Sequence, residues 1–406
     1  MNPDGRRNLL VLTSTFPRWS NDKEPRFVEL LCFELARHHD VTVLAPHFRG
    51  ARTLETIVSG GRTINVHRYR YFIAGLEVLA YNGGILSRIR HNPLSILLVP
   101  FFVAAQLVKM ISLHRKFQYD VIHAHWIVPQ GLVAGLFRRF SKTAPAIVVT
   151  SHGGDLFALR GKLLTLLKRW VLRTADQVTV VSEAMKSYCT DLGIEAEKIH
   201  VRSMGVDLTT TFTIGNSRLP REGLIFVGRL VEKKGVEYLL RAMAVLVARY
   251  PNLSLTVVGD GPDEKALRAL TGELRLDQNI SFVGSKLNAE LPALLRSAKI
   301  FVMPSIVAKS GDQEGLGLVA VEAMGCGCAV VATDLPAIRD TVQHRKTGLI
   351  ARAADADDLA ASIETLLKND ALRADLAIAG NRFAKNRFDW SIVGADYQSL
   401  ISEVRK

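Results

Sequence analysis

The sequence predicts an α/β protein made of two doubly wound, Rossmann-like domains that face each other across a cleft. The chain has 406 residues, about twice the length of one ordinary domain. Short β-branched segments alternate with helical segments of about 10–15 residues, which is the pattern of βαβ units. The strands are almost continuously apolar, so we expect two parallel sheets with helices on both faces.

The second half of the chain shows this alternation most clearly. Its predicted strands lie at residues 224–228, 253–259, 280–284, 299–305 and 328–334. Apolar residues at helical spacing fill the gaps between them, as in VEYLLRAMAVLVARY, DEKALRALTGEL and AELPALLRSA. We therefore expect residues 224–389 to form one Rossmann-like domain.

The first half repeats the scheme with longer insertions. Its predicted strands lie at residues 8–16, 40–47, 120–126, 146–152 and 177–183. A polar stretch with Gly and Pro, residues 208–223, predicts the linker, so residues 1–207 form the first domain. The last helix, residues 390–406, comes after the second sheet is complete, and we expect it to return to the first domain.

Positive charge is concentrated in the first half. Residues 1–220 contain 28 Lys and Arg against 16 Asp and Glu, a difference of +12, whereas residues 221–406 contain 24 against 23, a difference of +1. This imbalance favours an acidic partner such as phospholipid head groups, a polyprenyl phosphate or nucleic acid.

The longest uncharged apolar segment runs from Leu94 to Val108. It is shorter than the roughly 20 residues of a spanning helix, and Pro100 lies within it, so we do not expect it to cross a membrane. A buried or half-buried helix is one interpretation, and its basic flanks make a membrane-surface role the alternative. The start of the chain has no secretory pattern and four scattered cysteines fit a reducing cytoplasm.

The segment QEGLGLVAVEAMGCG, residues 313–327, allows two interpretations. Gly315-x-Gly317-x-x-Ala320 matches a dinucleotide fingerprint, and Asp334 stands about where a ribose-binding acid is expected. That fingerprint must follow a strand directly, however, and here the polar loop IVAKSGDQ intervenes. The sequence therefore argues against an NAD enzyme.

The second interpretation uses the two acids that bracket the glycines. Residues 315–318 open a helix whose free amides suit a phosphate, and Glu322 within that helix suits a ribose diol. Glu314 precedes the helix and reaches another part of the same ligand. Arg229 and Lys234, in GRLVEKKG, supply cations for a diphosphate. Together they predict a polyhydroxylated ligand with a diphosphate between its two ends.

These motifs carry a family resemblance. Through VGRLVEKKG, VVGDGPDE, ISFVGSK, PSIVAKSGDQEGLGLVAVEAMGCGCAVVATDLPAIRD and TGLI, residues 224–350 resemble the donor domain of retaining GT-B glycosyltransferases of the group 1 (family 4) type. The first half is similar to the matching acceptor domain through TSTFPRWSNDKEPRFVELLCFEL, DVIHAHWIVPQG, TSHGGDL and MGVD. The resemblance covers nearly the full chain.

The resemblance also implies roles for individual residues. Glu322 would bind the nucleotide ribose and Glu314 the hydroxyls of the transferred sugar. The other donor-binding residues would be Arg229 and Lys234 at the diphosphate, the amides of Gly315, Leu316, Gly317 and Leu318 at the sugar and phosphates, and Ser285 and Lys286 at the base.

In the first half, the resemblance places His152 beside the reacting sugar, with Asp155 near it. One departure concerns the end of the first strand, where many relatives have paired glycines. This chain has Phe16-Pro17-Arg18-Trp19 instead. The mode of acceptor binding therefore does not follow from the resemblance.

The activity that the resemblance implies is metal-independent transfer of a sugar, with retention, from a UDP- or GDP-sugar to a hydroxyl acceptor. We expect a lipid-linked acceptor of cell-envelope polysaccharide or glycolipid synthesis, no cofactor, no nucleic acid partner, and a peripheral site on the anionic inner face of the membrane. Three alternatives stay open: a nucleotide-sugar epimerase, a non-catalytic sensor, and a metal-dependent hydrolase that uses His123, His125, His152 and Asp155.

Overall fold

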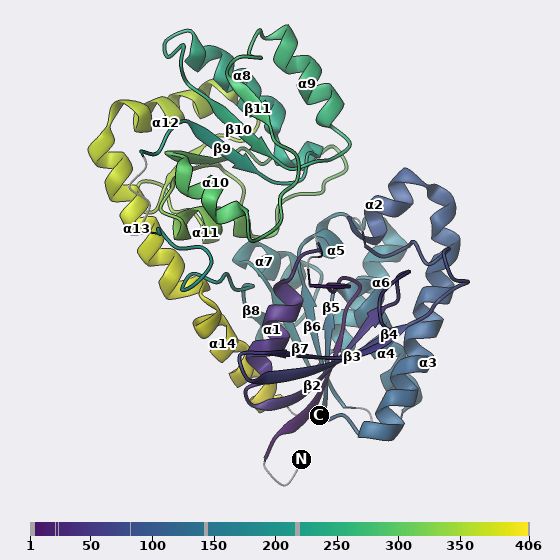
Figure 1. Cartoon of the computed structure of the whole chain (residues 1–406). Coiled ribbons are helices and arrows are strands. Elements are labelled where there is room, and N and C mark those ends of the chain that lie inside the picture. The colour runs from purple at the N-terminus through teal and green to yellow at the C-terminus, as the bar shows by residue number, and fades with distance from the viewer. Residues whose placement is uncertain are drawn as a thin grey trace. The chain divides into compact units, whose positions relative to one another are not determined.

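The computed structural model describes residues 5–20, 22, 24–81, 83–141, 145–215 and 220–404. The chain divides into two units, each with its own sheet (Figure 1). The first unit comprises residues 1–181, 185–204 and 393–406, and the second comprises residues 182–184 and 205–392. The predicted fold class of two parallel α/β units is confirmed.

In the described part of the first unit, eight strands form one sheet in the order β3-β4-β2-β1-β5-β6-β7-β8. Only β3 is antiparallel to its neighbour. The strands are β1 (Arg7–Leu12), β2 (His39–Pro46), β3 (Leu54–Ser59), β4 (Arg62–Tyr69), β5 (Val121–His125), β6 (Ala146–Ser151), β7 (Gln177–Val180) and β8 (Ile199–Val201).

The β3–β4 hairpin is absent from the sequence-based expectation. Its outer strand is largely solvent-exposed, so its side chains do not form the continuous apolar run of a buried strand. The signal that would have found it is Gly60-Gly61, which joins the two strands with positive φ at both residues, as a tight hairpin turn requires.

Helices cover both faces of the first sheet. They are α1 (Phe27–Leu35), α2 (Gly84–His91), α3 (Val99–Phe117), α4 (Leu132–Phe140), α5 (Gly154–Phe157), α6 (Lys162–Thr174) and α7 (Glu183–Asp191). The last helix, α14 (Trp390–Glu403), belongs to this unit from residue 393 onward, as predicted. Arg7 in β1 holds the end of α14 by donating hydrogen bonds to the carbonyl oxygens of Ile401 and Val404 at 2.9 and 2.8 Å.

The apolar segment around Pro100 differs from the expectation. The 3-10 helix η1 (Pro93–Leu98) runs directly into α3, and Pro100 lies in the first turn of α3, where no backbone N–H is needed. The combined helix, Pro93–Phe117, has 25 residues and is long and apolar enough to cross a membrane. The expectation that the segment is too short was therefore wrong. Only 22% of its most apolar window is buried, so the helix is half-buried, which is one of the two forms expected, and not a fully buried core helix.

The described part of the second unit contains a six-stranded parallel sheet in the order β11-β10-β9-β12-β13-β14. The chain reverses its direction of winding between β9 and β12, which is where ligands bind in such sheets. The strands are β9 (Leu224–Val227), β10 (Leu255–Val258), β11 (Ile280–Phe282), β12 (Ile300–Met303), β13 (Ala329–Thr333) and β14 (Leu349–Ala351).

Helices pack on this sheet through a core of aliphatic residues that includes Leu240, Val257, Val302 and Ile363, each without solvent exposure. The helices are α8 (Val236–Val247), α9 (Glu264–Glu273), α10 (Leu291–Ser297), α11 (Leu318–Gly325), α12 (Ala356–Lys368) and α13 (Asp370–Phe388). Apart from residues 182–184, the unit begins at Gly205, just before the expected linker. Val206 donates to the Phe388 carbonyl at 2.8 Å, and both Leu208 and Phe212 lie against Gly325.

Candidate functional site

Two loops meet at the switch point of the second sheet, one after β9 and one after β12. Gly235 ends the first loop with a left-handed φ of 62°, and a Cβ there would lie 1.9 Å from the Pro304 carbonyl oxygen. Ile306 donates its backbone N–H to the Lys233 carbonyl at 2.8 Å. Only glycine allows this approach, so Gly235 fixes the two loops against each other.

The motif VVGDGPDE holds the first loop from its other side. A Cβ on Gly259 would lie 1.9 Å from the Gly228 carbonyl oxygen, and one on Gly261 would lie 2.2 Å from that of Leu230. The Leu230 N–H donates to the Asp260 carbonyl at 2.8 Å. A side chain at position 259 or 261 would clash with the loop after β9, so both positions require glycine. The close packing also fixes the backbone conformation around Arg229.

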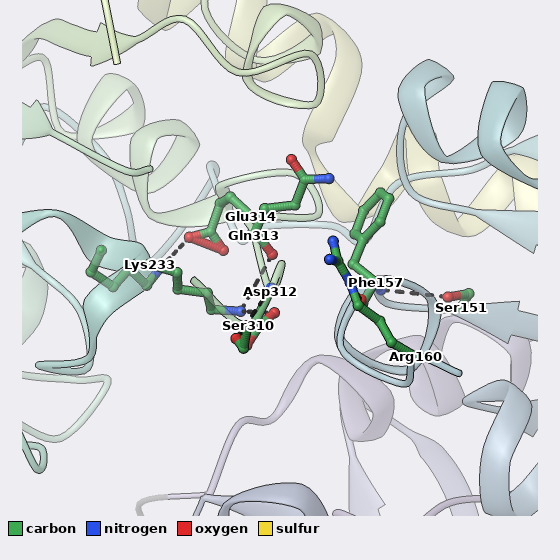
Figure 2. A network of polar contacts seen from close by, with 10 residues as sticks. Ser151, Phe157, Arg160, Lys233, Ser310, Asp312, Gln313 and Glu314 are labelled. Carbon is green, nitrogen blue, oxygen red and sulfur yellow. Dashed lines mark hydrogen bonds and ion pairs between the residues drawn. The ribbon is translucent and has the colours of Figure 1, made fainter. Parts of the chain in front are cut away.

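Two lysines join the loops by ion pairs. Lys234 Nζ lies 2.5 Å from Glu314 Oε2, and both side chains are largely buried. Beside it, Lys233 Nζ lies 3.2 Å from Asp312 Oδ1 and donates to the Gln313 carbonyl (Figure 2). The structure therefore brings Lys234 and Glu314 together. The pair of Lys233 and Asp312 was missed from the sequence, although both lie within the quoted motifs.

The charge state of Glu314 follows from these contacts. Burial raises the pKa of its carboxyl group, whereas the ammonium groups of Lys234 and Lys233 lower it, and the net shift is downward. Glu314 is therefore ionised at neutral pH. It is poised to accept hydrogen bonds from the hydroxyl groups of a ligand.

The glycine-rich segment leads into α11. Gly317 is the N-cap residue with a left-handed φ of 83°, so the helix begins at Leu318 rather than at Gly315. Gly315 and Leu316 lie in the bend before it. Glu322 lies inside the helix, as expected, and its carboxyl group interacts electrostatically with the Lys234 ammonium. Lys234 therefore interacts with both acids of the motif, by an ion pair with Glu314 and electrostatically with Glu322.

Burial raises the pKa of Glu322 from its usual value of 4.5 to about 8, against the opposing effect of Lys234. Because the folded-state pKa is raised, protonated Glu322 favours the folded state. This stabilisation is complete below pH 4.5 and is lost as the pH rises to about 8.

The variant Glu322→Gln resembles the protonated form at every pH, so it should not lose this stabilisation. The melting temperature of the variant minus that of the natural protein should therefore increase as the pH rises from 4.5 to about 8. A pH-independent difference would contradict the assignment.

The remaining residues predicted for donor binding also follow strands of this sheet. Arg229 is exposed directly after β9. Ser285 and Lys286 follow β11, and the Gly284 carbonyl beside them accepts the N–H of Gly259 at 3.0 Å. All three therefore lie at the carboxyl-end edge of the sheet, where the fold places ligands.

In the first unit, His152 follows β6 and is enclosed by rings. Phe27 and Trp126 have ring centroids 4.9 Å from that of His152. His125 stacks on it, and the two share a hydrogen bond of 2.9 Å between His125 Nδ1 and His152 Nε2. Burial, with a contribution from His123, lowers the pKa of His152 to about 3. His152 is therefore neutral at physiological pH, and its hydrogen bond to His125 fixes its orientation.

Asp155 holds the loop around His152 rather than presenting a free carboxylate. Its Oδ2 accepts the N–H of Ile127 at 2.7 Å, and its Oδ1 accepts the Ser151 hydroxyl at 2.8 Å and the His152 N–H at 3.3 Å. Asp155 is 3% exposed. These bonds assign it to positioning His152.

The same contacts bear on the metal-dependent alternative. His123 Nε2 bonds Thr150 Oγ1 at 2.7 Å, while His125 bonds His152, and Asp155 bonds backbone and Ser151. Among the residues that the structure describes, no group of three or more His, Cys, Asp or Glu side chains could hold a metal ion. The described geometry gives the hydrolase alternative no support, and metal independence stays a prediction.

The residues that replace paired glycines after β1 form an aromatic cluster. The Arg18 guanidinium lies 4.5 Å from the ring centroid of Trp19, 4.4 Å from that of Phe48 and 4.8 Å from that of Tyr81. It also forms a 2.7 Å ion pair with Asp22. The end of β1, beside the switch between β1 and β5, is therefore filled by a rigid cation and three rings.

Comparison with known proteins connects these observations. The family model of glycosyl transferases group 1 matches residues 210–383, and that of glycosyltransferase family 4 matches residues 25–210. A phosphatidyl-myo-inositol mannosyltransferase of Mycolicibacterium smegmatis is 30% identical over 375 residues, which cover 90% of this chain and 86% of that protein. The chain belongs to the group 1 glycosyltransferases.

Other relatives agree over the whole chain. A GDP-mannose-dependent α-(1-6)-phosphatidylinositol monomannoside mannosyltransferase of Mycolicibacterium smegmatis is 28% identical, covering 98% of this glycosyltransferase and 99% of that protein. Among solved structures, sucrose-phosphate synthase of Thermosynechococcus elongatus has a TM-score of 0.81 at 22% identity and covers 98% of each chain. Anabaena HepE in complex with UDP has a TM-score of 0.72 at 18% identity, covering 97% of this chain and 99% of that one. The fold is GT-B.

Proposed function

We propose that this glycosyltransferase moves a sugar from a nucleoside diphosphate sugar to a hydroxyl group of a lipid or lipid-linked acceptor, in the synthesis of a cell-envelope glycolipid or polysaccharide. The observation that carries the proposal is the pair of Lys234 and Glu314 at the switch point. In this proposal Lys234 is the cation for the diphosphate, and Glu314 beside it is the acid for the sugar. Arg229 and Glu322 extend the same site towards the phosphates and the ribose.

The names of the relatives support GDP-mannose as the donor. The relative that spans nearly the whole chain is named as GDP-mannose-dependent, and a second is a phosphatidyl-myo-inositol mannosyltransferase. A structural neighbour of the same fold binds UDP, so the base needs a direct test. We propose a mannosyl donor and an acceptor with a phosphorylated lipid head group.

The proposed mechanism relies on charge at the leaving group. Negative charge accumulates on the diphosphate as the glycosidic bond breaks, and Arg229, Lys234 and the N-terminus of α11 stabilise it without a metal. Both oxygens of Asp155 are held by donors, so it is not a nucleophile. We therefore favour front-face attack of the acceptor hydroxyl through an ion-pair-like transition state, with the configuration of the donor kept.

A binding screen followed by a transfer assay tests the proposal. Thermal shift with GDP, UDP, ADP and TDP should show one nucleotide that stabilises the protein most, expected to be GDP. The matching sugar nucleotide should then label a lipid extract only when the protein is present. Sugar transfer distinguishes the proposal from epimerisation, which needs no acceptor. Stabilisation by none of the four nucleotides, together with no transfer, would remove the proposal.

We further propose that the protein works as a peripheral protein on the cytoplasmic face of the membrane. The difference of +12 in residues 1–220 supports attraction to anionic lipid, since each Lys or Arg near such a surface contributes about 1 kcal/mol. The expected result is flotation with anionic vesicles that weakens as salt rises.

A further inference from the structure

The helix formed by η1 and α3 is apolar on two opposite faces. One face packs into the first unit through Phe102, Met110 and Leu113, which are buried. The opposite face carries Leu94, Leu97, Phe101 and Val108, whose exposed fractions are 74%, 65%, 53% and 67%. We call these four residues the apolar stripe. A helix that is apolar on both faces is normally enclosed by protein or by lipid, yet each of these four side chains is more than half exposed in the described structure.

Neighbouring segments widen the apolar surface. Phe72 lies edge-on to Phe101 with ring centroids 5.3 Å apart, and the adjacent Ile73 and Leu76 are exposed. Helix α2, which has no buried residue, packs against η1 and lies beside α3 (Figure 1). The stripe is therefore the centre of a larger apolar patch on the first unit.

The formal charges within residues 78–119 are all positive, and the preceding Glu77 is buried and ion-paired with Arg70. Residues 78–119 contain no Asp or Glu and five Lys or Arg, namely Arg88, Arg90, Lys109, Arg115 and Lys116. Arg90, Arg115 and Lys116 are exposed, at the two ends of the helical segment. An apolar centre with cationic ends is complementary to a surface of apolar chains beneath anionic groups.

We propose that the apolar stripe inserts into the interfacial region of an anionic lipid bilayer, with α3 lying along the surface and its basic ends at the level of the lipid phosphates. Spanning is inconsistent with the fold, because it would remove Phe102, Met110 and Leu113 from the core and place buried Gln106 in hydrocarbon. This inference goes beyond the transfer reaction and does not depend on it. It also differs from attachment by charge alone, which needs no insertion.

A single labelled cysteine tests the insertion. The cysteines Cys32, Cys189, Cys326 and Cys328 are all buried, so an environment-sensitive fluorophore will react selectively with Leu97→Cys. Vesicles of phosphatidylglycerol and phosphatidylcholine in equal parts should shift its emission to the blue. The matched control is Ile378→Cys, at an equally exposed apolar position on α13 of the second unit, and its emission should not change. The absence of a shift at position 97, or equal shifts at both positions, would overturn the proposal.

Flotation of a double variant separates insertion from charge. Leu97→Ser with Phe101→Ser should bind the same vesicles at least about tenfold more weakly, because two large apolar side chains are lost from the contact. The natural protein should keep part of its binding at high salt, while the variant should keep none. Turnover with a detergent-solubilised acceptor should be unchanged.

The other outcomes are equally informative. Binding of the double variant equal to that of the natural protein, abolished in both by salt, would show attachment by charge alone and overturn the insertion, while the proposed transfer would stand. A blue shift at position 97 that grows with protein concentration without vesicles would mean that a second copy of the chain covers the stripe, and would overturn the proposal as well.

Discussion

Lys234→Ala is expected to lower turnover by about a hundredfold to a thousandfold, which is the usual cost of removing one preorganised group that stabilises developing charge. Lys234 lies in the loop after β9 and is held by Glu314, so its ammonium group is in place before the ligand binds. The dissociation constant for the nucleoside diphosphate should also rise by about tenfold or more, as for loss of a charge-assisted contact. Steady-state kinetics and calorimetry measure the two effects, and Arg229→Ala should act in the same direction.

Two matched variants control for indirect effects. Lys233→Ala removes the neighbouring ion pair with Asp312, which joins the same two loops, and should cost much less activity. Arg241→Ala removes an exposed cation on α8 that pairs with Glu237, and should cost nothing measurable. Equal losses in Lys233→Ala and Lys234→Ala would mean that Lys234 only holds the loops together.

Glu314→Ala is expected to reduce turnover about as strongly as Lys234→Ala does, but without weakening the binding of the nucleoside diphosphate. The carboxylate is the predicted partner of the sugar hydroxyls, and its removal also frees Lys234 for the phosphates. Single-turnover measurements with the sugar nucleotide, beside calorimetry with the nucleotide alone, separate the two effects. Glu314→Gln keeps the shape and removes the charge, so it should recover little activity. Full activity in Glu314→Ala would mean that this acid does not contact the sugar.

The sequence predicted five of the six strands described in the second sheet, because buried parallel strands are apolar on both faces and their helices are regularly spaced. The three-residue strands β14 and, in the first sheet, β8 were missed. It missed the β3–β4 hairpin, where a mostly exposed edge strand mixes polar and apolar residues. It also misjudged the segment around Pro100. Length and composition cannot tell a core helix from a surface helix, since burial depends on which elements pack beside it.

For the candidate site too, the sequence indicated the residues of the motifs but not their partners in the fold. The motifs pointed to Lys234, Glu314 and Glu322, because Lys234 and Glu314 lie in loops that follow strands at the carboxyl-end edge of one sheet, and Glu322 lies in the helix after the second loop. Partners far apart in the chain were not predictable: Lys233 binds Asp312 across 79 positions, and His125 binds His152 across 27. The resemblance placed Asp155 near the reacting sugar without giving its contacts. Only the bonds to its two oxygens show that it positions its neighbours.

The most direct measurement of the central claim is the anomeric configuration of the product formed in EDTA. We predict that protein treated with chelator transfers the sugar at an undiminished rate, because Arg229, Lys234 and the N-terminus of α11 stabilise the leaving group. We also predict that NMR of the isolated product shows the anomeric configuration of the donor. Loss of transfer in EDTA that added metal restores, or a product of inverted configuration, would contradict metal-independent transfer with retention.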